Sequence, residues 1–307
     1  MIDNNNSNMI NLQARDDFNK ARSKATISNI LHTLTPERQE LLSLGDIRKL
    51  IKPKSETYIG MKTVDIDLII GSEGRYKDFN STFLPKKEFI RNRWESIDKA
   101  HLKSVILPPI KLYEIGGSYF VRDGNHRVSV AKMQGVMSID AEIIRLDTEI
   151  PLNPGMTLKK IEEAIIKYEK EHIYLNTELG AIIPAVDLNF TAPGRFYEVL
   201  RHIQGHKYFL NESSCEEISF IDAGKSWYKN LYIPIIYLVR DEKILGRFPG
   251  RTESDLYMWI IKHWDELKSL NGNNFSLQDA AISFSYKYGK SYFQQVFTLL
   301  KRIVKIK

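Results

Sequence analysis

The segment YEIGGSYFVRDGNHRVSVAKMQGVMSIDAEIIRL, residues 113–146, constrains the fold more than any other part of the chain. Two strand-like runs flank the pair Gly116-Gly117, which is typical of a two-residue β-hairpin turn. A helical run follows and ends near Gly135, and SIDAEIIRL then has the pattern of another strand. Because strands and a helix alternate over this short stretch, the segment predicts a small core of the α+β class.

The region before this segment completes the predicted core. Residues 1–10 are rich in asparagine and are expected to be disordered, and a helical pattern follows over about residues 11–52. We interpret residues 1–62 as an N-terminal helical lead-in. A first strand is expected around TVDIDLIIG, where Val64, Ile66 and Leu68 alternate with acidic residues. We therefore place the core, a mixed sheet with helices, at residues 63–150.

The second half of the chain is predicted to be mainly helical. Prolines and a glycine mark a linker, and an amphipathic run then predicts a long helix over residues 157–176, so the linker and long helix occupy residues 151–184. Residues 185–307 form a predicted C-terminal helical domain. Within it, Thr252 is the expected N-cap of a helix, with Asp255 in the capping-box position.

The composition excludes several classes of protein. No run approaches the roughly 18 apolar residues of a membrane span, and the N-terminus lacks the basic and apolar regions of a secretory signal. The one cysteine, Cys215, cannot form an internal disulfide, and it fits a reducing compartment. We expect a cytoplasmic protein. We also expect no metal site, because His202 and His206, four residues apart, have no acidic third ligand near them in sequence.

The net charge of +6 is concentrated at the C-terminus. After Asp279 there are six basic residues and no acidic one, while the preceding chain carries 38 basic and 38 acidic residues. Such a tail could bind nucleic acid or an acidic membrane surface. The alternative is a terminal helix with solvated lysines, because Phe293, Phe297, Leu300 and Val304 recur at helical spacing.

The five residues Asp123-Gly124-Asn125-His126-Arg127, here called the box, lie where a predicted strand passes into a helix. The start of a helix has unpaired N–H groups and a positive dipole end, so it favours an anion. Gly124 allows close approach of the backbone, Arg127 can donate two parallel hydrogen bonds, and His126 can donate or transfer a proton. Asp123 can cap the helix, hold magnesium through water or accept a proton. A capped helix whose arginine pairs with a carboxylate explains these residues equally well.

The order of these motifs resembles the N-terminal domain of ParB partition proteins and the related sulfiredoxins. In that superfamily an arginine follows the first strand, matched by Arg75, and a Gly-x-x-Arg motif opens a helix, matched by Gly124 to Arg127. The resemblance covers residues 63–146 and implies a pocket for nucleotide phosphates. The phosphate-binding residues would be Gly124, Asn125, His126, Arg127 and Arg75. The whole chain also resembles bacterial proteins of unknown function that join a ParB-like domain to a helical domain.

The chain departs from the better-known members of that superfamily. Sulfiredoxins place a reactive cysteine directly before the His-Arg pair, where this chain has Asn125, so we do not expect sulfiredoxin chemistry. Partition ParB proteins have a more basic box and a helix-turn-helix domain, which we do not find. Members that phosphorylate free serine have an Asp-Gly-His motif near this position and a glutamate after the first strand. Asp123 and Glu73 occupy comparable places, although Asn125 interrupts the Asp-Gly-His order.

Together these features predict binding of a nucleoside triphosphate, with Mg²⁺, at the box. Hydrolysis or phosphoryl transfer to a small molecule would use Asp123 and His126, with Glu73 as a reserve carboxylate. The alternative is a ParB-like regulatory or DNA-associated adaptor without catalysis, which would bind DNA in a salt-sensitive way through the basic tail. A third interpretation is structural, and then Arg127 stabilises the fold and nothing else. The sequence specifies neither the base nor the oligomeric state.

One further segment, FPGRTESDLYMWIIKHW, combines aromatic side chains with Arg251 after a Pro-Gly turn. Tyr257, Trp259 and Trp264 recur at helical spacing, which favours core packing over a surface that stacks bases. A second arginine, Arg195, also follows a Pro-Gly pair, and turn geometry alone explains both pairs.

Overall fold

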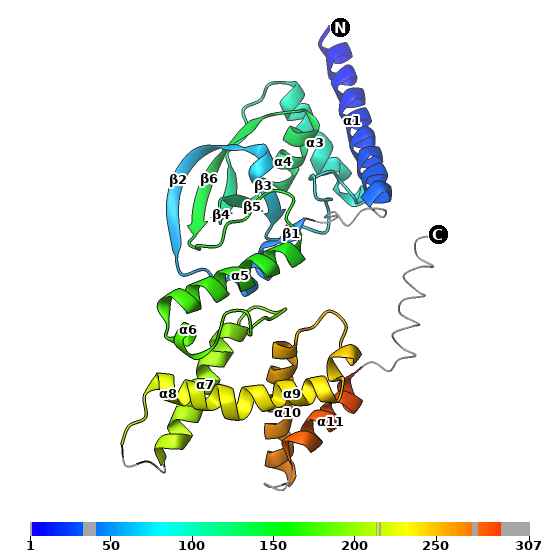
Figure 1. The fold of residues 1–307 in the computed structure, drawn as a ribbon. Coiled ribbons are helices and arrows are strands. Elements are labelled where there is room, and N and C mark those ends of the chain that lie inside the picture. The colour runs from blue at the N-terminus through cyan, green and yellow to red at the C-terminus, as the bar shows by residue number, and fades with distance from the viewer. Residues whose placement is uncertain (1, 33–40, 213, 215, 272–275, 290–307) are drawn as a thin grey trace. The chain divides into compact units, whose positions relative to one another are not determined.

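The computed structural model describes residues 2–32, 41–212, 214, 216–271 and 276–289. The chain divides into two compact units, Met1–Ile161 and Glu162–Lys307. The first unit contains a six-stranded sheet with helices, and the described residues of the second unit form helices only (Figure 1). The predicted α+β class with a mainly helical second part is therefore confirmed. No described helix combines the length and the apolar character that a membrane span requires.

The sheet of the first unit is mixed, with the strand order β1-β3-β5-β4-β6-β2. Its strands are β1 (Leu42–Ser43), β2 (Glu56–Asp65), β3 (Ile69–Ser72), β4 (Ile110–Ile115), β5 (Ser118–Asp123) and β6 (Ser138–Leu146). β1, β3 and β5 are parallel, β4 is antiparallel to β5 and parallel to β6, and β2 is antiparallel to β6. The carboxyl ends of β1, β3 and β5 therefore lie at the same edge of the sheet.

Helices α1, α3 and α4 pack around a buried tryptophan of the first unit. The helices of this unit are α1 (Ile2–His32), α2 (Leu44–Ile51), α3 (Arg91–Leu102) and α4 (Asn125–Met133), with 3₁₀ turns at Ile66–Leu68 and Glu88–Ile90. Trp94 of α3 is fully buried, and its ring meets that of Phe18 in α1 edge-on at 5.5 Å. The indole Nε1 of Trp94 donates a hydrogen bond to Ser129 Oγ of α4 at 2.8 Å. This core fixes the start of α4 against the sheet.

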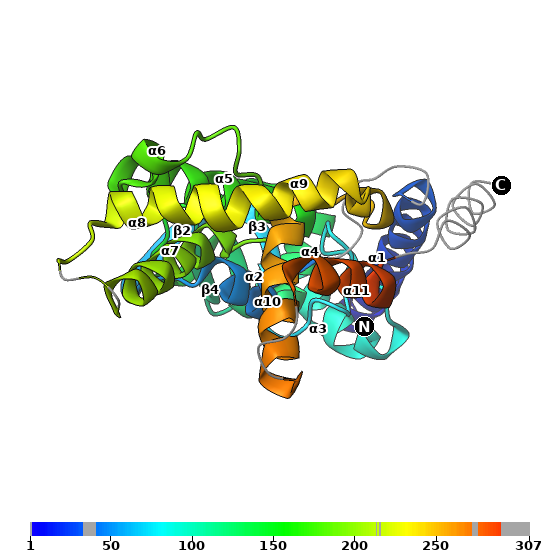
Figure 2. The ribbon, with the colours of Figure 1, turned by 60° about the horizontal axis from the view of Figure 1, so that its bottom comes forward.

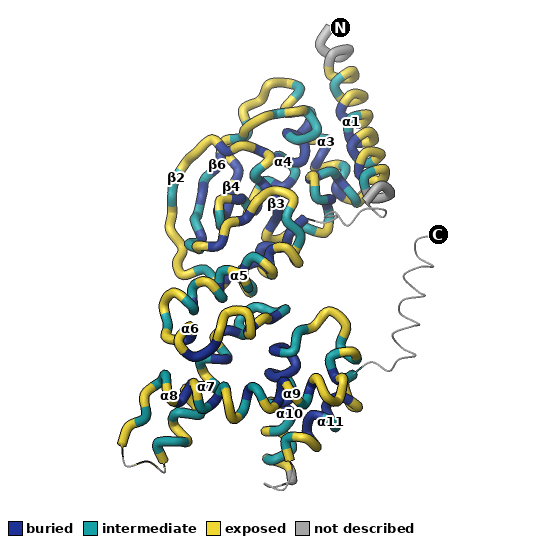
Figure 3. Tube along the Cα trace, in the orientation of Figure 1, coloured by how far each residue is buried: buried dark blue, intermediate teal, exposed yellow. Residues whose placement is uncertain are grey.

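The predicted hairpin at Gly116-Gly117, the helix after it and the closing strand are all confirmed. The first strand differs from its prediction. The chain ends β2 at Asp65, makes a 3₁₀ turn, and begins β3 only at Ile69. β2 instead starts at Glu56, before the predicted start of the core at residue 63, and pairs with β6 along its length. The expected disorder of residues 1–10 is wrong, because α1 already begins at Ile2. Most of its side chains are exposed (Figure 3), so the alternation that marks a half-buried strand is missing there.

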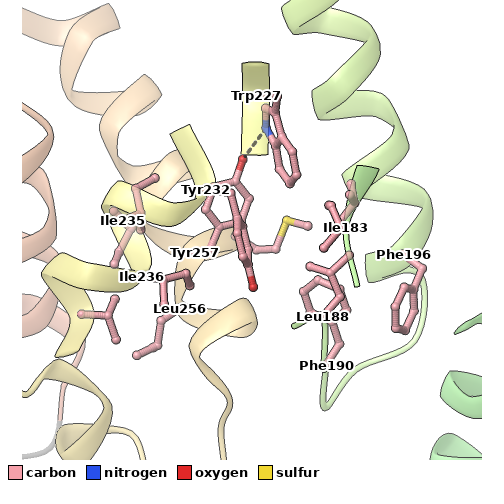
Figure 4. Packing of buried hydrophobic residues seen from close by; sticks show 14 of the residues in the cluster. Ile183, Leu188, Phe190, Phe196, Trp227, Tyr232, Ile235, Ile236, Leu256 and Tyr257 are labelled. Carbon is pink, nitrogen blue, oxygen red and sulfur yellow. Dashed lines mark hydrogen bonds between the residues drawn. The ribbon is translucent and has the colours of Figure 1, made fainter. Parts of the chain in front are cut away.

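The second unit is a bundle of helices around an aromatic core. Its helices are α5 (Leu158–Asn176, which begins in the first unit), α6 (Leu179–Ile182), α7 (Arg195–Glu212), α8 (Phe220–Trp227), α9 (Ile233–Asp241), α10 (Glu253–Asn271) and α11 (Leu277–Tyr288). A π-helical turn, Tyr228–Tyr232, joins α8 to α9 in one continuous rod, yellow in Figure 2. In the core, Trp227 Nε1 donates a hydrogen bond to the Tyr257 hydroxyl at 3.0 Å (Figure 4).

The predicted capping box at the start of α10 is confirmed. The Asp255 N–H donates to Thr252 Oγ1 at 3.2 Å, and the Thr252 N–H donates to Asp255 Oδ2 at 3.1 Å. Tyr257 is buried as expected, whereas Trp259 is only partly buried. Cys215, the predicted terminal helix and the basic tail beyond Lys287 lie outside the described residues.

Candidate anion-binding site

Two parallel strands bring the predicted site residues to one edge of the sheet. β3 pairs with β5, with Ser72 opposite Val121, and the Glu73 N–H donates to the Val121 carbonyl at 2.9 Å. The loop after β3 carries Arg75, and the box follows β5. The structure therefore brings together two segments about 50 residues apart in sequence, as the predicted site required.

The backbone of the box adopts a conformation that suits glycine. Gly124 has φ of 108° and ψ of 21°, in the left-handed region, and it precedes the first residue of α4. A Cβ atom at this position would lie 2.5 Å from Ile110 Cγ2. Among the residues that the structure describes, no side chain caps α4, so the Asp123 carboxylate does not fill the capping role. The first N–H groups of α4 therefore have no side-chain acceptor at the helix start.

Arg127 makes its contacts within the chain. Its guanidinium donates to the carbonyl oxygens of Pro108 and Pro109, to the second at 2.9 Å, and forms an ion pair with Asp123 Oδ2 at 2.6 Å. The Arg127 side chain is 15% exposed. Three acceptors of the chain thus already hold the arginine of the Gly-x-x-Arg motif, and it fastens the loop before β4 to the start of α4.

His126 is neutral near pH 7 in this position. Burial, together with the smaller effect of the positive charges of Arg75 and Arg93, lowers the pKa of its imidazole from the ordinary 6.5 to about 4. The ring packs edge-on against Phe79 with centroids 5.6 Å apart. Its Nδ1 is buried and, within the described residues, has no hydrogen-bond partner. A neutral imidazole of low pKa is a weak base, but it can still donate one N–H.

Asn125 is the second polar group without a full set of partners. The residue is 8% exposed, and its Oδ1 is buried without a hydrogen-bond partner among the residues described. The oxygen and nitrogen of an amide can be exchanged by turning the group, so Asn125 can present a donor or an acceptor. Buried polar atoms without partners are costly, which favours a polar ligand or water at the start of α4.

The predicted catalytic carboxylates are arranged less favourably. The Asp123 side chain is 67% exposed and paired with Arg127, and Glu73 is exposed in the loop after β3. Within the described ranges, no group of three or more His, Cys, Asp and Glu side chains could hold a metal ion. The ring nitrogens of His202 and His206 contact different partners, the Tyr257 hydroxyl at 3.1 Å and Ser226 Oγ at 3.0 Å.

Sequence reasoning missed Arg93. It lies at an exposed position of α3, in a run of charged residues, and nothing in its local sequence relates it to the box. Only packing of α3 against α4 brings its charge near His126. Arg75 and Arg93 are therefore the cations whose charges lower the pKa of His126. Arg75 is half-exposed and lies 3.4 Å from Asp78 Oδ2.

Comparisons with known proteins identify no close relative. No family model matches the chain, and no curated protein matches it. Two solved structures are similar to it, one crystal form of a Pnob8-like ParB-N domain and a second structure of a pNOB8-like ParB N-domain. The first is 14% identical, with 81% of this chain and 99% of that chain covered and a TM-score of 0.22. The second is 14% identical, with 80% and 88% covered and a TM-score of 0.22.

Proposed function

We propose that the first unit binds a nucleotide by its phosphates at the start of α4. One observation supports this most: among the described residues the start of α4 has no side-chain cap, its first two residues each have a buried polar atom without a partner, and the charges of Arg75 and Arg93 act on His126 there. A helix start of this kind suits phosphate oxygens, which accept from backbone N–H groups and neutralise the arginines. The motif order of residues 63–146 favours a nucleotide over other phosphates.

The residues of the box would then have different roles. Gly124 leaves room for a phosphate near the backbone, and Asn125 and His126 donate to its oxygens from the first turn of α4. Arg75 supplies positive charge from the neighbouring loop, together with Arg93. In this proposal Arg127 positions the helix start, since its guanidinium is already bound to Asp123 and two carbonyl oxygens.

Magnesium and turnover are further parts of the proposal. Mg²⁺ usually takes one or two carboxylates together with phosphate oxygens and water, so Asp123 or Glu73 would hold it beside a bound nucleotide. Hydrolysis or phosphoryl transfer would need a group that accepts a proton. His126 is poorly suited to this near pH 7, because its pKa lies at about 4. The geometry supports binding more strongly than it supports catalysis.

The test uses the full chain with ATP, ADP, CTP and GTP, each with and without Mg²⁺, in thermal-shift and calorimetric titrations. The variants are Arg75→Ala and Arg93→Ala, and the control is Lys62→Ala, an exposed cation on β2. We expect at least one nucleotide to bind wild type and control, and about ten-fold weaker binding in each arginine variant. Absence of binding, or equal binding in all four proteins, contradicts the proposal.

A DNA-associated role is the second candidate, and the charge distribution favours it. The six basic residues after Asp279 form the whole positive surplus of the chain. Titration of the full chain with duplex DNA at increasing salt tests this role, because each phosphate contact adds about −0.9 to the slope of log affinity against log salt. Replacing Lys301, Arg302 and Lys305 by glutamine should make that slope shallower. Binding that is insensitive to salt and to these substitutions contradicts the role.

A further inference from the structure

The second unit contains a cavity that neither the box nor its proposed ligand explains. Its volume is about 530 Å³, and its walls come from the turn before α10, from α10 itself and from α11. This volume lies in the range of roughly 300–1,000 Å³ that is usual for small-molecule sites. The described residues that line it all belong to the second unit, and none of them belongs to the site proposed at α4.

One wall of the cavity is aromatic. Phe248 and Phe284 stack with ring centroids 5.3 Å apart and planes 12° apart. Trp259 contacts both rings, with centroid distances of 6.0 and 6.2 Å, and Tyr288 lies 5.2 Å from Phe284. Since the rings support one another, the wall is preorganised, and the partly exposed Trp259 presents a flat apolar surface to a planar ligand.

Three cations surround this aromatic wall, and none has a carboxylate partner in the part of the chain that the structure describes: Arg247, Arg251 and Lys262. Arg251 donates to Thr191 Oγ1 at 2.7 Å and lies 5.3 Å from the centre of the Trp259 ring. Arg247 donates to Ser285 Oγ at 2.8 Å. Hydroxyl partners hold the guanidinium groups in place without neutralising them, so the cavity favours an anion.

A buried histidine adds an unpaired polar atom to the lining. His263 is 4% exposed, and its Nε2 lies 3.2 Å from Ser283 Oγ. Its Nδ1 has no hydrogen-bond partner among the described residues and is 3.9 Å from Glu266, the one carboxylate of the lining. A buried polar atom left without a partner is costly, which favours a polar group of a ligand beside it.

We propose that this cavity binds a small anion that carries a flat aromatic ring. The ring lies against Trp259 and Phe248, and the anionic group accepts hydrogen bonds from Arg247, Arg251 and Lys262. The structure favours both features together, because the aromatic wall and the cations border the same space. A carboxylate and a phosphate share the required chemistry, and the test separates them.

The test titrates the full chain by calorimetry with four probes: phenyl phosphate, benzoate, inorganic phosphate and benzyl alcohol. We expect phenyl phosphate or benzoate to bind, and the probes with only a charge or only a ring to bind at least about ten-fold more weakly. Arg251→Gln and Trp259→Leu should each weaken binding of the preferred probe by about ten-fold. Lys229→Gln, an exposed cation outside the lining, should leave it unchanged.

Two results overturn the proposal. The first is a wild-type chain that binds none of the four probes more tightly than about 10 mM. The second is equal binding of the probe by wild type and by folded Arg251→Gln and Trp259→Leu, checked by circular dichroism. Arg75→Ala serves as a further control and should bind the probe as wild type does, which separates this site from the one at α4.

Discussion

Arg127 lies three residues after Gly124, and Arg251 lies directly after Gly250. Both glycines have a positive φ, yet the two arginines differ in their exposure and in their partners. Arg127 belongs to a recognisable motif, is 15% exposed, and is bound to one carboxylate and two carbonyl oxygens of its own chain. Arg251 follows a Pro-Gly pair, which turn geometry alone explains. It is exposed, it contacts one hydroxyl, and it has no carboxylate partner among the described residues. The comparison teaches that motif membership does not by itself identify the charges that remain available for a ligand.

The same distinction applies inside the first unit. Arg75 and Arg93 are exposed or half-exposed, and the one carboxylate contact found for them in the described ranges is the 3.4 Å pair of Arg75 with Asp78. Exposed pairs of this kind contribute little to stability, so Arg75 can exchange its partner for a phosphate at low cost. Arg127 would have to give up its ion pair with Asp123 and its two carbonyl acceptors to do so.

The largest change in the free energy of unfolding is expected when the glycine of one of these two turns, Gly124 or Gly250, is replaced by alanine. At Gly124 an added Cβ would lie 2.5 Å from Ile110 Cγ2 and 3.2 Å from Arg127 Nε, whereas at Gly250 nothing lies within 4 Å. Gly124→Ala should lower the free energy of unfolding by about 3 kcal/mol, from strain and overlap together. Gly250→Ala should cost about 1 kcal/mol, from strain alone. Urea unfolding measures both, and equal losses would contradict the difference between the two turns.

Removing the Arg127 side chain should mainly affect stability. Arg127→Ala removes the hydrogen bonds of a charged guanidinium to Pro108, Pro109 and Asp123, at a cost of about 2 kcal/mol. The nucleotide affinity of Arg127→Ala, measured at a temperature where the variant is folded, should change less than that of Arg75→Ala. Arg75→Ala should retain wild-type stability. The opposite outcome, a stable Arg127→Ala protein that has lost its nucleotide, would make Arg127 a phosphate ligand.

The pH dependence of stability should contain a contribution from His126. Its pKa is about 4 in the folded chain, below the ordinary 6.5, because of burial and the nearby arginines. The unfolded chain therefore takes up the proton at a higher pH, so stability falls as pH decreases from about 6.5 to about 4. His126→Gln should flatten this part of the profile, while His101→Gln, at an exposed position of α3, should not. Urea unfolding at several pH values between 4 and 6.5 checks this prediction. Identical dependence of stability on pH in wild type and His126→Gln would contradict the contribution of His126.

The smallest effect is expected at the cavity of the second unit. Arg251 and Lys262 are exposed and have no carboxylate partner among the described residues. Arg251→Gln and Lys262→Gln should each change the free energy of unfolding by less than about 0.5 kcal/mol, as is usual for surface positions. Chemical unfolding of both variants measures this. A loss of about 2 kcal/mol in either would mean that the cation stabilises the fold as Arg127 does.

Local signals made much of the fold predictable. Gly116-Gly117 specifies the hairpin, and the pair Thr252 and Asp255 marks the start of α10, because in each case the residues act on their own neighbours. The predicted position of the first strand is wrong, because the position of β2 depends on its pairing with β6 and not on an alternating apolar face. Pairing of this kind is a long-range property that no local pattern carries.

The candidate site was predictable only in part. The box and the loop of Arg75 could be related through the motif order, and parallel pairing of β3 with β5 brings them to one edge. The contribution of Arg93 depends on the packing of α3, and the internal use of Arg127 depends on the carbonyl oxygens of a distant loop. Both are tertiary contacts, and the same holds for the cations around Trp259.

The most direct measurement is a titration of the full chain with inorganic pyrophosphate, followed through the backbone amide resonances. The phosphate site proposed at the start of α4 requires the largest shifts at residues 125–127, because their N–H groups would donate to the anion, whereas the Val128 N–H already donates to the Gly124 carbonyl. It also requires these shifts to disappear in Arg75→Ala and to persist in Lys62→Ala. Resonances at α4 that do not move while others do, or that move equally in all three proteins, would contradict the site.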